Sequence, residues 1–135
     1  MRVADGIGHE VRRSVLVVDE SNLFRELLVS RLSHSSFSAY GAGSPTEAWE
    51  VFKAVDPDAL IVEVNLTAKT NGITLAEEML THSPGIGLIF LTNVGHPRIV
   101  SPETSDIPAG AGYMHKAAVR HTENVLNAVD AVLRE

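Results

Sequence analysis

Cysteine is absent from this 135-residue sequence, which excludes disulfide bonds, thiolate nucleophiles and cysteine-based zinc sites. No apolar run approaches the roughly 20 residues that a membrane-spanning helix needs. Residues 1–13 lack the apolar stretch of a signal peptide. We therefore expect a cytoplasmic protein that makes no contact with membranes.

Positive charge is also scarce. Lysine and arginine number 11 against 17 aspartate and glutamate residues, giving a net charge of −6, so this segment would repel the phosphate backbone of a nucleic acid. The six histidines are scattered without metal-ligand spacing. The length and the hydrophobic share of 44% fit one globular domain with a real core. We expect a flexible tail at 1–13 and one domain over 14–135.

Apolar runs that fit strands alternate with stretches that fit helices. The expected strands are residues 15–19, 37–40, 59–64, 87–92 and 111–115. A first helix is expected after Ser21 or Asn22, with Leu23, Leu27, Leu28 and Leu32 on its inner face. Further helices are expected after Ser44, over 73–79 and over 119–133. This alternation predicts an α/β fold, a doubly wound five-stranded parallel sheet with helices on both faces.

Two segments carry strong local signals. Ser44, Pro45 and Glu47 have the spacing of a helix cap, a first helical proline and a capping-box glutamate. Residues 96–110 contain Pro97, Pro102 and Pro108, which a regular helix does not tolerate. We therefore expect the fourth helix to be short or irregular.

Polar side chains follow the expected strands where each strand ends. Asp19 and Glu20 follow the first strand, Glu63 the third, Thr92 the fourth and Lys116 the fifth. Because parallel strands present their carboxyl ends at one edge, we expect these five side chains to share a pocket. Three carboxylates there need a compensating cation, either Mg²⁺ or the ammonium of Lys116. Such a set suits a phosphoryl group held on a carboxylate.

Each residue also has an ordinary structural interpretation. Glu63 is then a surface charge at a strand end, Asp19 and Glu20 favour the N-terminus of the first helix, and Tyr113 is a packing aromatic. Thr92 is a strand-end hydroxyl and Lys116 a solvated charge. Trp49 is expected to pack against the core.

Several motifs in order resemble the receiver domain of two-component response regulators (CheY-like) over residues 14–135. They are Val17-Val18-Asp19-Glu20, the third strand with Asn71-Gly72, Leu91-Thr92, and Gly112-Tyr113-Met114-His115-Lys116. The resemblance implies a flavodoxin-like strand order of 2-1-3-4-5. It also implies signal transduction through a phosphorelay rather than enzymatic catalysis.

The resemblance assigns a role to each site residue. Asp19 and Glu20 correspond to the acidic pocket that binds Mg²⁺, and Glu63 stands where the family has its phosphoacceptor aspartate. Thr92 and Lys116 correspond to the residues that sense the phosphoryl group, and Tyr113 to the aromatic switch that swings inward. A weak Mg²⁺ site, if one forms, is expected at Asp19, Glu20, Glu63 and Asn65. No other cofactor is expected.

Three departures from the family pattern bear on function. The extra methylene of Glu63 moves its carboxylate toward the place of a phosphoryl group, which opposes efficient phosphorylation. Glutamate either imitates the phosphorylated form or disables the site, and we expect an atypical (pseudo-)receiver. Thr67 and Ala117 stand where the family carries prolines.

The segment from Pro84 to Lys116 is similar to receivers of LuxR-type (NarL/FixJ) transcription regulators. The expected function is therefore transcription regulation through a C-terminal helix-turn-helix absent from this chain, which would supply any DNA contact. A homodimer through helix one and helix five, and a sensor kinase as partner, are also expected. The alternatives are a stand-alone receiver acting by protein–protein interaction and a Mg²⁺-dependent phosphohydrolase. A flavodoxin-like cofactor carrier is disfavoured by the acidic Asp19-Glu20.

Overall fold

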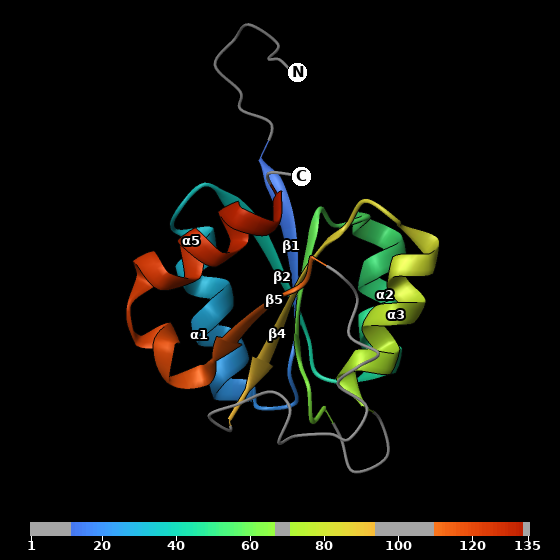
Figure 1. Ribbon diagram of the computed structural model, residues 1–135, viewed down its shortest axis with the longest axis horizontal. Coiled ribbons are helices and arrows are strands. Elements are labelled where there is room, and N and C mark those ends of the chain that lie inside the picture. The colour runs from blue at the N-terminus through green and yellow to red at the C-terminus, as the bar shows by residue number, and fades with distance from the viewer. Residues whose placement is uncertain (1–11, 67–70, 94–109, 134–135) are drawn as a thin grey trace, which may run out of the picture.

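The computed structural model describes residues 12–66, 71–93 and 110–133, in which five parallel strands form one sheet. The strand order is β2-β1-β3-β4-β5, which confirms the expected doubly wound order. The strands are β1 (Arg13–Val18), β2 (Phe37–Ala42), β3 (Ala59–Glu63), β4 (Gly87–Thr92) and β5 (Gly112–His115). Figure 1 shows α1 (Asn22–Ser33) and α5 (Thr122–Leu133) on one face, and α2 (Pro45–Val55) and α3 (Gly72–His82) on the other.

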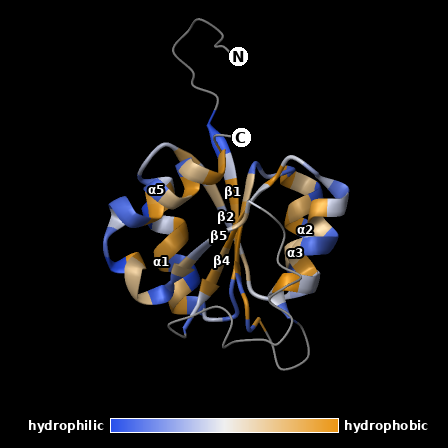
Figure 2. Cartoon of the chain, viewed as in Figure 1, coloured by the Kyte–Doolittle hydropathy of each residue, from blue (hydrophilic) through white to orange (hydrophobic). Residues whose placement is uncertain are grey.

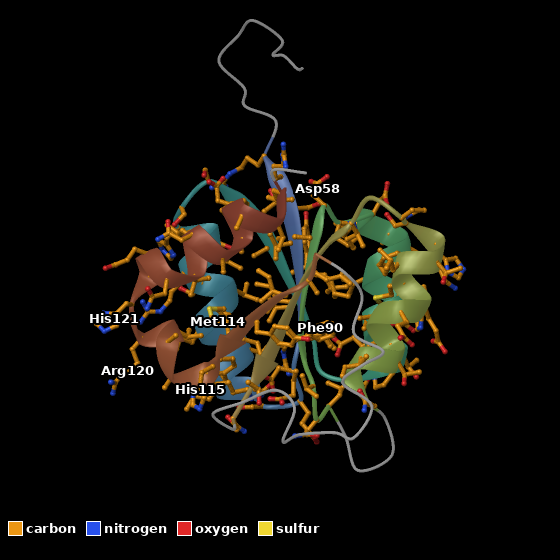
Figure 3. All side chains as sticks on the ribbon, in the orientation of Figure 1. Asp58, Phe90, Met114, His115, Arg120 and His121 are labelled. Carbon is orange, nitrogen blue, oxygen red and sulfur yellow. The ribbon has the colours of Figure 1, made fainter. Side chains whose placement is uncertain are left out.

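The core is divided by the sheet because successive strand side chains point to opposite faces. Leu16 and Val18 of β1 pack toward α2 and α3, whereas Val15 and Val17 pack toward α1 and α5. Phe90 and Met114, labelled in Figure 3, belong to these two clusters respectively. The hydropathy colours in Figure 2 show the same arrangement, with apolar strands between helices whose polar residues are on the outside. No helix in the described ranges is long and apolar enough to cross a membrane.

Most of the expected boundaries lie within one or two residues of those in the structure, the usual scatter at element ends. Strand β1 begins at Arg13, one residue inside the expected tail, and ends at Val18. Strand β2 continues to Ala42, and α3 runs three residues beyond the expected end at Met79. The rest of the tail (1–11) and most of the proline-containing segment expected to form an irregular fourth helix (96–110) lie outside the described residues.

The expected inner face of α1 is partly wrong. Leu28 and Leu32 are fully buried, but Leu23 is 83% exposed and Leu27 is 39% exposed. Phe24, one position after Leu23, is partly buried and packs against the core instead. Phe24, Leu28 and Leu32 are spaced four residues apart, so they form the continuous inward stripe of this helix.

The final helix forms and ends at Leu133 as expected, but its expected start at Val119 is wrong. The chain forms a 3₁₀ helix, η2 (Lys116–Arg120), and α5 begins at Thr122 after His121 in an extended conformation. The side chain of His115 accepts a hydrogen bond from the Ala117 backbone N–H at 3.0 Å and caps η2. The tighter turn places Lys116 directly after β5 and buries Val119.

The helix caps confirm the local signals of the sequence. Ser44 Oγ accepts a hydrogen bond from the Glu47 N–H, and Glu47 Oε1 accepts one from the Gly43 N–H rather than from Ser44. Asn71 caps α3, and Gly72 begins it. A Cβ at Gly72 would lie 2.0 Å from the carbonyl oxygen of Glu63, so only glycine fits against the end of β3.

Candidate functional site

The strand register brings the expected residues to one edge of the sheet. Val18 is paired with Val62, Glu63 with Leu91, and Thr92 with His115. Asp19, Glu63, Thr92 and Lys116 therefore lie at or directly after the carboxyl ends of four neighbouring strands. Figure 3 shows this edge through the label of His115, opposite the edge that carries Asp58.

Asp19 is held by both its backbone and its side chain. Its N–H donates to the Ala42 carbonyl at 3.1 Å, which fixes the residue against the end of β2. Its Oδ1 accepts a hydrogen bond from the Ser21 N–H at 2.9 Å, and its Oδ2 lies 2.7 Å from Lys116 Nζ. Asp19 is 1% exposed, so its carboxylate exchanges water almost entirely for these partners.

Glu63 is held in a similar way from the other side. Its Oε1 lies 2.6 Å from Lys116 Nζ, and its Oε2 accepts a hydrogen bond from the Asn65 N–H at 3.1 Å. Glu63 is 4% exposed. The interpretation of Glu63 as a free surface charge is therefore wrong, because its side chain is buried in an ion pair.

Lys116 is the cation that the two buried carboxylates share. Burial alone would lower the pKa of Lys116, but the hydrogen bonds and negative charges of Asp19 and Glu63 outweigh it and raise the pKa above the usual 10.5. Nζ also lies 4.5 Å from the centroid of the Phe24 ring, a cation–π contact. The expected alternative of a solvated lysine is wrong.

The other expected residues lie nearby but differ in exposure. Thr92 is buried, whereas Glu20 and Asn65 are exposed. Tyr113 is 40% exposed, and its ring centroid lies 5.9 Å from that of Phe90. Partial desolvation raises the pKa of the Tyr113 hydroxyl. The structure thus joins Asp19, Glu63 and Lys116 through contacts, while Glu20, Asn65 and Tyr113 lie toward solvent.

The arrangement does not present a ready site for a divalent cation. Within the described ranges, no three histidine or acidic side chains gather closely enough to hold a metal ion. Each oxygen of the Asp19 and Glu63 carboxylates is already engaged, one by a backbone N–H and the other by Lys116. The ammonium thus supplies the compensating positive charge.

Two residues of this region were missed by the sequence analysis. Phe24 covers Lys116, and Arg25 donates from Nη1 to the Asp19 carbonyl at 2.7 Å. Both lie in the first turn of α1, a few residues after Asp19. An arginine close after an acidic strand end, with Gly41 and Gly43 ending the neighbouring strand, is the signal that could have revealed the second.

Replacing Lys116 with methionine should leave two buried carboxylates facing each other. We expect the free energy of unfolding at about pH 8 to fall by about 3 to 5 kcal/mol, as when one partner of a buried ion pair is removed. The loss should shrink at about pH 5, because one carboxylate can then take up a proton. Urea unfolding of wild type and variant at both pH values measures this.

A second variant provides the control. Lys116→Met combined with Glu63→Gln removes the excess negative charge and should recover part of the lost stability at about pH 8. On the alkaline side, the raised pKa of Lys116 in the wild type means that the ion pair still contributes fully up to pH 10.5 and is lost as the pH rises through the folded-state pKa. Equal losses at both acidic and alkaline pH for Lys116→Met would show that the charges do not interact as described.

Comparison with known proteins agrees with this geometry. Residues 15–105 match the response regulator receiver domain family. The chain is 29% identical to the chemotaxis protein CheY of Halobacterium salinarum over 122 residues, covering 90% of this chain and 97% of that protein. The fold is similar to Vibrio cholerae CheY4, with a TM-score of 0.79, 22% identity and coverage of 91% and 100%. It is also similar to the N-terminal domain of a response regulator/sensory box/GGDEF 3-domain protein from Carboxydothermus hydrogenoformans (TM-score 0.78, 21% identity, coverage 90% and 94%). This chain belongs to the response regulator receiver domain family.

Proposed function

We propose that this two-component receiver is a pseudo-receiver, in which Glu63 takes the place of the phosphoacceptor aspartate and phosphate no longer sets the signalling state. The observation that carries the proposal is the Glu63–Lys116–Asp19 ion triad, with Lys116 Nζ 2.6 Å from Glu63 and 2.7 Å from Asp19. A carboxylate that attacks phosphorus needs a free oxygen and accurate placement. Both Glu63 oxygens are engaged, and the side chain is almost fully buried.

The same contacts favour a disabled site over an imitation of the phosphorylated form. A phosphate monoester carries about −1.5 to −2 charges, whereas Glu63 carries one that Lys116 already neutralises in part. In the receiver family the switch aromatic swings inward, and Tyr113 here is 40% exposed. We infer that Glu63 holds the resting arrangement of the switch residues Thr92, Tyr113 and Lys116.

Intact-mass spectrometry after incubation with acetyl phosphate and Mg²⁺ tests the proposal. The wild type should stay unmodified, because Glu63 is misplaced and engaged. The Glu63→Asp variant should gain one phosphoryl group, because the shorter side chain restores the family geometry. Phosphorylation of the wild type on Glu63 would refute the proposal, and an unmodified Glu63→Asp variant would show that the scaffold has lost the chemistry at other positions too.

We propose that any Mg²⁺ binding by Asp19, Glu20, Glu63 and Asn65 is weak, because the ion must displace Lys116. When bound, the ion would neutralise the negative charge of the pocket and of a phosphoryl group. Isothermal titration with millimolar Mg²⁺ should give little or no heat with the wild type and clear binding with Lys116→Met. Strong binding by the wild type would show that the ammonium withdraws readily.

We propose a homodimer through the face formed by α1 and α5. The support is Leu23, a large apolar side chain exposed on α1, with Leu27 one turn further along the same helix. Leu23→Ser should raise the dimer dissociation constant about tenfold or more, because each copy loses one buried leucine. Sedimentation velocity measures this, with Tyr40→Ser, an exposed change on β2, as the matched control. A monomeric wild type, or equal effects of both variants, would exclude this interface.

The output of the module follows one of two routes. We propose transcription regulation of the LuxR type, with a C-terminal helix-turn-helix outside this sequence making the DNA contacts and a sensor kinase upstream. The second candidate is a stand-alone cytoplasmic receiver that acts by protein–protein interaction without catalysis of its own. It is favoured by the match to a chemotaxis protein over 97% of that protein's length. The size of the native product on an immunoblot distinguishes these routes.

A further inference from the structure

Arg25 lies beside the ion triad, where the end of β1, the first turn of α1 and the end of β2 meet. Its Nη1 donates to the backbone carbonyl of Asp19 at 2.7 Å, and its Nη2 donates to Oδ1 of Asn22. The guanidinium therefore bridges the last residue of the β1 edge and the first turn of α1. The Asp19 N–H is bound to Ala42 on β2, so the peptide groups on both sides of Asp19 are held.

The course of Arg25 depends on two glycines at the end of β2. A Cβ at Gly41 would lie 3.1 Å from Cδ of Arg25, and a Cβ at Gly43 would lie 2.9 Å from Nη1. Both distances are shorter than ordinary van der Waals contact. The glycines thus leave a slot in which the aliphatic stem and the fork of Arg25 lie across the strand end.

We propose that Arg25, seated in the slot made by Gly41 and Gly43, is a positioning residue that sets the place of Asp19 against Lys116. Arginine suits this task because its planar fork reaches two acceptors at once, which the single ammonium of lysine does not do in the same geometry. The Asp19 carbonyl and the Asp19 carboxylate belong to one residue, so fixing the first restricts the second. The inference concerns the triad itself, and its meaning for signalling rests on the proposed function.

The test changes both partners of the contact, Arg25 and the glycine slot in which it lies. Arg25→Lys and Arg25→Ala remove the fork, and Gly43→Ala displaces it. Because the atom nearest the new methyl is Nη1 at the far end of the flexible Arg25 side chain, the fold can accommodate the methyl by moving the guanidinium alone. The readout is the loss of unfolding free energy that Lys116→Met causes at about pH 8, measured by urea unfolding in each background. In all three variants we expect Lys116→Met to cause a smaller loss than in the wild type, because Asp19 is no longer held close to Lys116.

Matched controls separate positioning from general destabilisation. Gly85→Ala adds the same methyl where no atom lies within 4 Å, and Arg120→Ala removes an exposed arginine from η2; both should leave the effect of Lys116→Met on stability unchanged. Gly43→Ala should have no further effect in the Arg25→Ala background, since the two changes break one contact. An unchanged effect of Lys116→Met in the Arg25 variants, or an equal effect of Gly43→Ala with and without Arg25, would overturn the proposal.

A second measurement connects the positioning role of Arg25 to the proposed function. In the Glu63→Asp background, adding Arg25→Lys should slow phosphorylation by acetyl phosphate about tenfold or more, because the acidic pocket is displaced. An unslowed rate would contradict the positioning role. If Glu63→Asp is never phosphorylated, the proposed function fails on that ground, and the effect of Lys116→Met in the Arg25 variants still decides the role of Arg25.

Discussion

Two buried carboxylates can lie at one edge of this sheet because a single ammonium lies between them. Asp19 and Glu63 are on neighbouring strands, and without Lys116 their charges would repel each other in a medium that screens poorly. The ion triad therefore ties the first, third and fifth strands together at the edge where their loops leave the sheet. It also fixes where η2 must begin, since Lys116 is both the first residue of η2 and the shared cation.

The surrounding residues fix the positions of the two carboxylates that contact Lys116. Asp19 is bound through its N–H, its carbonyl and both side-chain oxygens, and Glu63 through both side-chain oxygens. Beneath Glu63, the absence of a side chain at Gly72 lets α3 approach the end of β3. Charge pairing, hydrogen bonding and backbone packing thus restrict the same few atoms, which is the condition for a polar network to have one arrangement.

The sequence was sufficient to predict the strand order and the residues at the carboxyl edge, because buried parallel strands appear as apolar runs and their ends share one edge. It did not settle which leucines of α1 point inward. Leu23 and Phe24 are adjacent apolar residues, and the choice between them depends on how the helix rotates against α5 and the sheet. The extended His121 between η2 and α5 and the 40% exposure of Tyr113 were also not predictable from the apolar pattern. Arg25 was missed because its acceptor is a backbone carbonyl, so its signal in the sequence was limited to its place after an acidic strand end and to the two glycines of the neighbouring strand.

The carboxylate of Glu63 affects the net charge of the triad as well as the distance to Lys116. Two carboxylates and one ammonium leave one net negative charge in a nearly closed space. A phosphoryl group on Glu63 would increase that negative charge and displace the ammonium from its present contact. An aspartate at this position would have one methylene less, so its carboxylate would begin further from Lys116 Nζ than that of Glu63 does. Under the proposed function, the short contact between Glu63 and Lys116 would therefore stabilise the resting arrangement and oppose phosphorylation at the same position.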